Sequence, residues 1–82
     1  MTISAEVIRL LDEVLSLHGR SSTFTVDTPL LGALPELDSM AVATLITTIE
    51  ERFGFPIQDD EISGETFATV GSLAAFVSAR AG

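Results

Sequence analysis

The chain has 82 residues, a formal net charge of −8 and 46% hydrophobic residues. This size predicts one small domain over residues 1–82, with a modest core and without a deep, dry active site. Twelve acidic residues face four arginines and no lysine, which excludes a nucleic-acid surface and favours partners with basic surfaces. The absence of cysteine excludes disulfides, a thiol nucleophile and a thiolate metal site.

The sequence shows no sign of membrane insertion or secretion. No apolar run approaches the roughly 18 residues that span a bilayer. The N-terminus lacks a basic segment followed by an apolar block, so no signal peptide is expected. We therefore expect a cytoplasmic monomer that neither binds nucleic acid nor inserts into a membrane.

Apolar residues recur with helical spacing from Ile3 to Leu17, which predicts a first helix. Its buried face comprises Ile3, Val7, Leu10, Leu11, Val14 and Leu17. We expect His18-Gly19 to end this helix, with the glycine as the C-cap. His18 has no catalytic partner in a recognisable motif, so a place at the helix C-terminus suits it better than catalysis.

The next segment, Arg20 to Asp38, is rich in serine, threonine, proline and glycine and predicts a long loop. Apolar residues are spread through it: Phe24, Val26, Leu30, Leu31, Leu34 and Leu37. Because a long structureless loop is unusual in a compact domain, we expect these residues to pin it across the core. A short helical turn is expected to begin at Thr28-Pro29 or at Leu34-Pro35.

The second helix is predicted from Ser39 to Phe53, before Gly54 and Pro56. Its core stripe comprises Val42, Leu45, Ile46, Ile49 and Phe53, and its outer side comprises Met40, Ala41, Thr44, Thr48 and Glu51. Met40 therefore either is exposed as a docking contact beside Ser39 or folds back on the loop.

Two further helices are predicted. Asp59–Ser63 forms a short one, capped by Asp59 or Asp60 and ended by Gly64. The last helix runs from its N-cap Thr69 to Ala79, with an apolar face of Val70, Leu73, Ala74 and Val77. Since no segment alternates with period two, the fold class is all-α: a small four-helix bundle with three longer helices, one short helix and a long first loop.

Enzyme motifs are missing from the sequence. There is no glycine-rich phosphate loop, no HExxH and no GxSxG. The acidic run Asp59–Glu61 lacks the spacing of an EF-hand, so we expect solvated side chains and no metal site. The chain is therefore expected to have no catalytic activity of its own.

Asp38-Ser39 is the candidate site for a chemical modification of the chain. An acidic residue and a serine at a helix start can cap backbone N–H groups, and the helix dipole there also favours a phosphate on the hydroxyl. Taken alone, the pair fits a cap more often than a modification site. Glu36 and Asp38 beside an exposed serine can attract a basic modifying enzyme or hold Mg²⁺ during modification.

Three motifs carry a resemblance to a known family. Leu34–Met40, Ile49–Ile57 and Phe67–Leu73 resemble, in order, the Asp-Ser-Leu attachment motif, the Glu-Glu-x-Phe-Gly helix end and the Thr-Val-Gly-x-Leu start of the last helix in the acyl carrier protein family. The resemblance covers nearly the whole chain and implies an acyl-carrier-protein-like fold.

The resemblance also implies a function. Ser39 would carry 4′-phosphopantetheine, transferred from coenzyme A by a separate phosphopantetheinyl transferase, and Asp38 would help orient the serine and Mg²⁺. The thiol of the arm would hold acyl groups as thioesters. The chain would thus be a non-catalytic carrier that serves acyl-loading ligases or synthases with basic docking surfaces.

The chain departs from carriers of fatty acid synthases, which have Leu at Met40 and acidic residues at Ala41 and Thr44. Its acidity lies instead near the end of the second helix and beyond, which favours a specialised carrier. The run Leu30–Met40 resembles carriers of exosortase-type surface-sorting systems. The expected partner-binding residues are Met40, Glu36, Thr44, Glu50, Glu51, Asp59 and Asp60.

A crevice for the acyl chain is expected between the second helix and the short third one, lined by Leu45, Ile46, Ile62 and Phe67. The alternative is that these four are ordinary core residues. Two other functions stay open: an unmodified helical interaction module, and an aminoacyl or peptidyl carrier. The latter more often has a Gly-Gly pair before the motif and less acidity.

Overall fold

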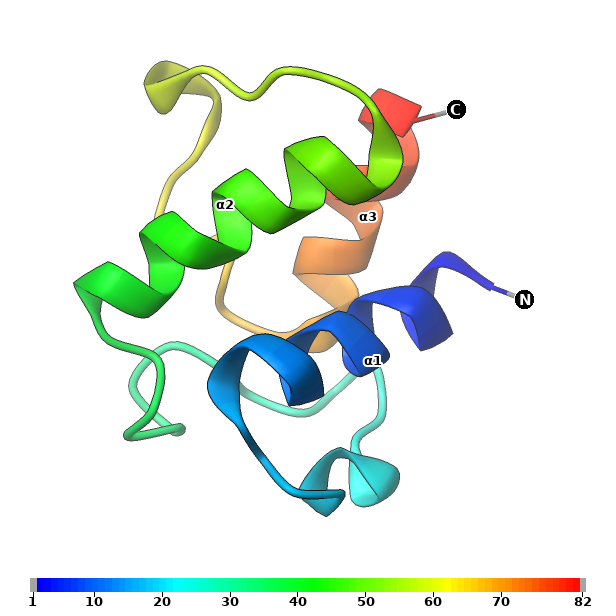
Figure 1. Ribbon diagram of the computed structural model, residues 1–82, viewed down its shortest axis with the longest axis vertical. Coiled ribbons are helices and arrows are strands. Elements are labelled where there is room, and N and C mark those ends of the chain that lie inside the picture. Colours follow the sequence, from blue (N-terminus) through cyan, green and yellow to red (C-terminus); the bar gives the residue numbers. More distant parts are fainter. Residues whose placement is uncertain (1, 82) are drawn as a thin grey trace.

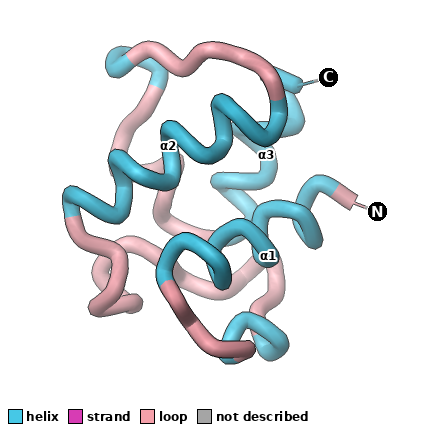
Figure 2. The backbone as a smooth tube through the Cα atoms, viewed as in Figure 1, coloured by secondary structure: helices cyan, strands magenta, loops and turns pink. Residues whose placement is uncertain are grey.

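The computed structural model describes residues 2–81, apart from the side chain of Asp59. It contains three α-helices in the described chain, α1 (Ile3–Leu15), α2 (Ser39–Phe53) and α3 (Val70–Ala81). Figure 1 shows α1 and α2 in front of α3, and long loops connect them in Figure 2. The all-α fold class and the bounds of α2 agree with the sequence prediction.

The prediction of a short third helix is wrong. The segment expected at Asp59–Ser63 forms only a 3-10 turn, η2 (Asp59–Glu61). The Glu61 N–H donates to the Gln58 carbonyl at 3.0 Å, which closes one turn. A helical nucleus this short gains few hydrogen bonds for the backbone it orders, and Gly64 follows within three residues, so it does not propagate.

The helix α1 ends earlier than the sequence predicts. Its C-cap is Ser16, in the left-handed conformation at φ 53°, rather than Gly19. The Leu17 N–H donates to the Asp12 carbonyl at 3.1 Å, and the Leu17 side chain is fully buried. The backbone therefore turns after Leu15, which brings Leu17 into the core although it lies outside the helix.

The core lies where the three helices meet. The predicted face of α3 is confirmed, because Val70, Leu73, Ala74 and Val77 are all buried. From α2, Leu45 and Ile49 are buried, while Val42, Ile46 and Phe53 pack partly buried against the core. From α1 and the turn after it come Val7, Leu10, Leu11, Leu15 and Leu17.

The long loop between α1 and α2 is pinned against the start of α3. The Leu30 N–H donates to the Ala68 carbonyl and the Leu31 N–H to the Phe67 carbonyl, both at 2.9 Å. The Gly71 N–H donates to the Val26 carbonyl at 2.8 Å. Leu30 and Leu37 are buried, which confirms that the loop is pinned across the core. The expectation for Val26 and Leu31 is wrong, since these side chains are 50% and 46% exposed.

The short turn predicted within this loop is confirmed at one of the two expected places. Leu34-Pro35 begins a single turn, which the Leu37 N–H closes on the Leu34 carbonyl at 3.0 Å. The 3-10 helix of the loop lies elsewhere, at η1 (Arg20–Thr23). At the other expected place, Pro29 forms an isolated antiparallel bridge with Thr69. Pro29 and Thr69 are far apart in the sequence, so this pairing depends on the tertiary fold.

The N-cap predicted for the last helix is confirmed. The Ser72 N–H donates to the Thr69 hydroxyl at 3.0 Å. The helix extends to Ala81, two residues beyond the prediction, a difference within the ordinary scatter of helix ends. In the described chain, each helix is too short or too polar to cross a membrane.

Candidate functional site

Asp38 and Ser39 form the N-terminus of α2. Asp38 is the N-cap: its Oδ1 accepts from the Ala41 N–H at 2.8 Å, and its carbonyl accepts from the Val42 N–H at 2.9 Å. Ser39 is the first helical residue, and its side chain is exposed. Because Asp38 supplies the cap, the Ser39 hydroxyl is left for other chemistry.

The backbone around Ser39 suits a phosphate. The Ser39 and Met40 N–H groups lie in the first turn, where no intrahelical acceptor exists. Among the described residues nothing else accepts from them. A phosphodiester on the Ser39 oxygen would therefore meet free N–H donors and the positive end of the helix dipole. The residues present thus fit a phosphate-linked prosthetic group.

The residues just before the serine are firmly held. Leu37 is buried in the core at 6% exposure. The Glu36 carboxylate forms an ion pair with Arg20 of η1. The hydrogen bond from Arg20 lowers the pKa of Glu36 below its ordinary value, so the carboxylate stays ionised at neutral pH. Glu36 therefore already has a partner within the chain.

The outer face of α2 is uncharged beside the serine. Met40 is 79% exposed, so it does not fold back on the loop. The Thr44 hydroxyl donates to the Met40 carbonyl at 3.0 Å, and Thr48 donates in the same way to Thr44 at 2.8 Å. A shallow groove of about 420 Å³ on this face is lined by Ala43, Thr44, Thr47, Thr48 and Glu51.

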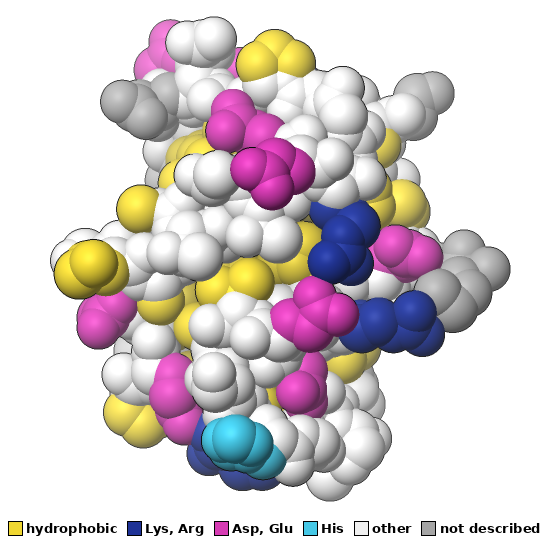
Figure 3. All heavy atoms as spheres, in the orientation of Figure 1, with side chains coloured by type: hydrophobic (Ala, Val, Ile, Leu, Met, Phe, Trp, Pro, Cys, Tyr) yellow, Lys and Arg dark blue, Asp and Glu magenta, His cyan; other side chains and the backbone are white. Residues whose placement is uncertain are grey.

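The acidic residues predicted to bind partners differ in availability. Glu51 and Asp60 are exposed. Glu50 is half-buried, and its Oε2 accepts from the Ile57 N–H at 2.7 Å, so it stabilises the turn after α2. The side chain of Asp59 lies outside the described residues. Figure 3 shows acidic side chains scattered over one face of the molecule rather than gathered in one stripe.

The four residues predicted to line an acyl crevice lie in or against one core. Leu45 and Phe67 are buried at 0% and 3% exposure. Ile46 and Ile62 are partly buried and pack against the core. These side chains come from α2 and from the segment that joins η2 to α3.

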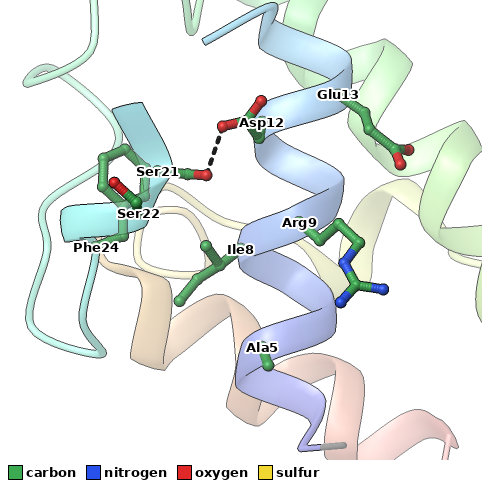
Figure 4. Close-up of a pocket in the computed structure, with 8 residues that line it drawn as sticks. All are labelled: Ala5, Ile8, Arg9, Asp12, Glu13, Ser21, Ser22 and Phe24. Carbon is green, nitrogen blue, oxygen red and sulfur yellow. Dashed lines mark hydrogen bonds between the residues drawn. The ribbon is translucent and has the colours of Figure 1, made fainter. Parts of the chain in front are cut away.

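A second surface hollow lies between α1 and η1 (Figure 4), with a volume of about 430 Å³. Ile8 and Phe24 supply apolar walls. At its rim, the Ser21 hydroxyl donates to Asp12 at 2.5 Å, and this bond is the main reason why the pKa of Asp12 is lowered. No sequence motif marks Asp12, because its partners Gly19 and Ser21 come close to it only in the folded chain.

Comparisons with known proteins agree with this geometry. A family model described as a phosphopantetheine attachment site matches residues 5–77. A solved structure of a holo acyl carrier protein from Nitrosomonas europaea is 51% identical, with a TM-score of 0.89, over 96% of this chain and 95% of that chain. The chain belongs to the acyl carrier protein family. No curated protein matches it.

Membership of the acyl carrier protein family settles the class of function that the sequence predicted. The chain is a non-catalytic carrier, and its prosthetic group is 4′-phosphopantetheine. Its partners are a phosphopantetheinyl transferase and enzymes that handle acyl groups. Within the described residues, no cluster of histidine or acidic side chains could hold a metal ion by itself.

Proposed function

We propose that Ser39 is the attachment point of the 4′-phosphopantetheine arm. The observation that supports this most directly is an exposed serine at the first position of α2, beside two backbone N–H groups without acceptors in the described chain. Asp38, the residue before Ser39, caps the helix through its Oδ1. In this proposal the second carboxylate oxygen helps to orient Mg²⁺ while the transferase acts.

The arm supplies a terminal thiol that holds an acyl group as a thioester. The chain itself contributes the serine oxygen, the helix N-terminus and the surface that partner enzymes contact. Transfer from coenzyme A is catalysed by a separate phosphopantetheinyl transferase, as family membership implies.

Mass spectrometry of the intact protein tests this assignment. After incubation with coenzyme A, Mg²⁺ and a broad-specificity phosphopantetheinyl transferase, we expect the wild type to gain the mass of one phosphopantetheine. Ser39→Ala should gain none, because it lacks the accepting oxygen. Ser78→Ala is the matched control, since Ser78 is also an exposed helical serine and lies on α3.

Two results would overturn the assignment. One is a folded wild type that never gains mass, which would leave an unmodified interaction module as the better description. The other is a Ser39→Ala variant that is still modified. The group found on protein purified from the native host would then separate an acyl cargo from an aminoacyl or peptidyl one.

We propose that partner enzymes dock on the exposed residues around the start and outer face of α2, with Met40 and Thr44 near the arm and Glu51 and Asp60 farther away. Basic partner surfaces would meet the acidic residues. The helix face next to Ser39 is uncharged, so enzymes whose basic surfaces pair with acidic residues at these positions should bind poorly. This supports a role in a specialised pathway. We also propose a cytoplasmic monomer, since a net charge of −8 opposes self-association.

We further propose that the acyl chain enters between α2 and the segment before α3, against Leu45, Ile46, Ile62 and Phe67. Partial exposure of Ile46 and Ile62 supports an opening there. Methyl resonances of Ile46 and Ile62 should then shift when an eight-carbon chain replaces an acetyl group on the arm. Methyls of Val7 in α1 serve as the control. Identical spectra for both chain lengths would rule this crevice out.

A further inference from the structure

The residues that precede Ser39 are each tied to a different part of the molecule. Leu37 is buried in the core, and Asp38 caps α2. Glu36 reaches Arg20, which lies sixteen residues earlier in the sequence. Of these three ties, the ion pair is the one that substitution of a single distant side chain removes.

Arg20 is the partner of the Glu36 carboxylate. The Glu36 Oε2 accepts from the Arg20 guanidinium, while its Oε1 is covered and has no hydrogen-bond partner among the described residues. The Glu36 side chain as a whole is 29% exposed, so the pair has the modest strength of a surface ion pair. Without Arg20, we expect the Glu36 side chain to turn towards water and to shift its backbone.

Arg20 is itself held in place from α1. Its Nε donates to the Leu17 carbonyl at 3.2 Å. The turn that carries it is fixed by Asp12, whose carboxylate accepts from the Gly19 N–H at 3.1 Å and from the Ser21 hydroxyl at 2.5 Å. A continuous set of contacts therefore runs from α1 through Arg20 and Glu36 to the residues before Ser39.

We infer that Arg20 is a positioning residue for the modification of Ser39, because it holds Glu36 and thereby fixes the backbone that presents the serine to the transferase. This inference rests on the proposed role of Ser39. It also assigns Glu36 to an internal ion pair rather than to direct contact with a partner. When the pair is broken, a smaller fraction of the carrier has the competent arrangement, so the apparent affinity of the transferase falls.

The kinetics of modification by a broad-specificity transferase with coenzyme A test the inference. Arg20→Gln and Glu36→Gln should each lower kcat/KM by about two- to fivefold, the equivalent of an exposed ion pair. Arg52→Gln is the matched control. It breaks the pair with Glu13 at 3.0 Å, which joins α1 to the far end of α2, and should leave kcat/KM unchanged.

Combined variants distinguish positioning from direct contact with the transferase. The double variant Arg20→Gln/Glu36→Gln should be no slower than either single variant, because both remove the same pair. The charge swap Arg20→Glu/Glu36→Arg should recover most of the lost rate, and Arg20→Lys should recover part of it. These rescues would not occur if the enzyme itself contacted Glu36.

Three outcomes overturn the inference: an unchanged rate in Arg20→Gln, a much larger loss in Glu36→Gln than in Arg20→Gln, or an equal loss in Arg52→Gln. Backbone amide spectra of the unmodified protein provide a test that needs no transferase. Arg20→Gln should shift the amides of residues 36–40, and Arg52→Gln should not. Unmoved amides in Arg20→Gln contradict the inference even where the wild type proves not to be modified.

Discussion

Two neighbouring side chains have different roles at the start of α2. Asp38 satisfies a backbone N–H of the first turn, and Ser39 keeps its hydroxyl exposed. A serine at the N-cap position would bond to that N–H itself, and its oxygen would be less available. The order of the pair therefore decides which residue supports the helix and which one is free for modification.

Substitution of Asp38 separates its capping role from its charge. Asp38→Ala should lower the free energy of unfolding by about 1 kcal/mol, because the Ala41 N–H loses its acceptor. Asp38→Asn should cost much less, because the amide oxygen can still accept this bond. Urea denaturation of both variants measures the difference. Equal losses would mean that the charge, and not the cap, stabilises the helix.

At the scale of elements, the loop after α1 and the start of α3 form one packed unit. Backbone groups of residues 26–31 bond with those of residues 67–71. Gly71 is the point of closest approach. A Cβ there would lie 2.8 Å from the Val26 carbonyl oxygen and 3.3 Å from the Val26 Cβ. Because the obstructing oxygen is backbone, a side-chain rotation cannot relieve the clash.

Gly71→Ala should therefore lower the free energy of unfolding by about 1–3 kcal/mol, as overpacking does, although alanine is the better helix former. Gly64→Ala is the matched control. Its added Cβ would have Leu31 Cδ2 at 3.8 Å as its nearest neighbour, an ordinary contact. Thermal unfolding of both variants measures the effect. A Gly71→Ala protein as stable as the wild type would show that the loop moves away at little cost.

At the scale of the whole molecule, three of the four arginines link separate segments of the chain through ion pairs. Arg20 pairs with Glu36, Arg52 with Glu13 and Arg80 with Glu61, and each pair joins two different parts of the chain. Arg80 also lies over the Phe55 ring, 5.7 Å from its centroid. With twelve acidic residues and four basic ones, most carboxylates still repel one another.

Salt should therefore stabilise the folded protein at neutral pH. The Debye length is about 30 Å at 0.01 M salt and about 8 Å at 0.15 M. The molecule measures 28 × 28 × 20 Å, so repulsion acts across all of it at low salt. We expect the melting temperature to rise between these concentrations. The rise should shrink near pH 4.2, the isoelectric point. A flat or falling melting temperature at neutral pH would contradict this.

Local patterns in the sequence were enough for the helices and for the candidate serine. The apolar period fixed the bounds of α2 and the face of α3, and Thr69 marked the N-cap. These features depend on neighbours within about one helical turn, so they can be read without the fold. The exposed Asp38-Ser39 junction follows from the same local rules.

Tertiary structure decided the features that depend on distant partners. Leu17 is buried in a core to which all three helices contribute, and Leu31 is exposed although its backbone bonds to the segment before α3. The pairing of Arg20 with Glu36 likewise joins residues sixteen positions apart. A hydrophobic pattern predicts that a side chain is buried, but only the folded chain determines which residues pack against it.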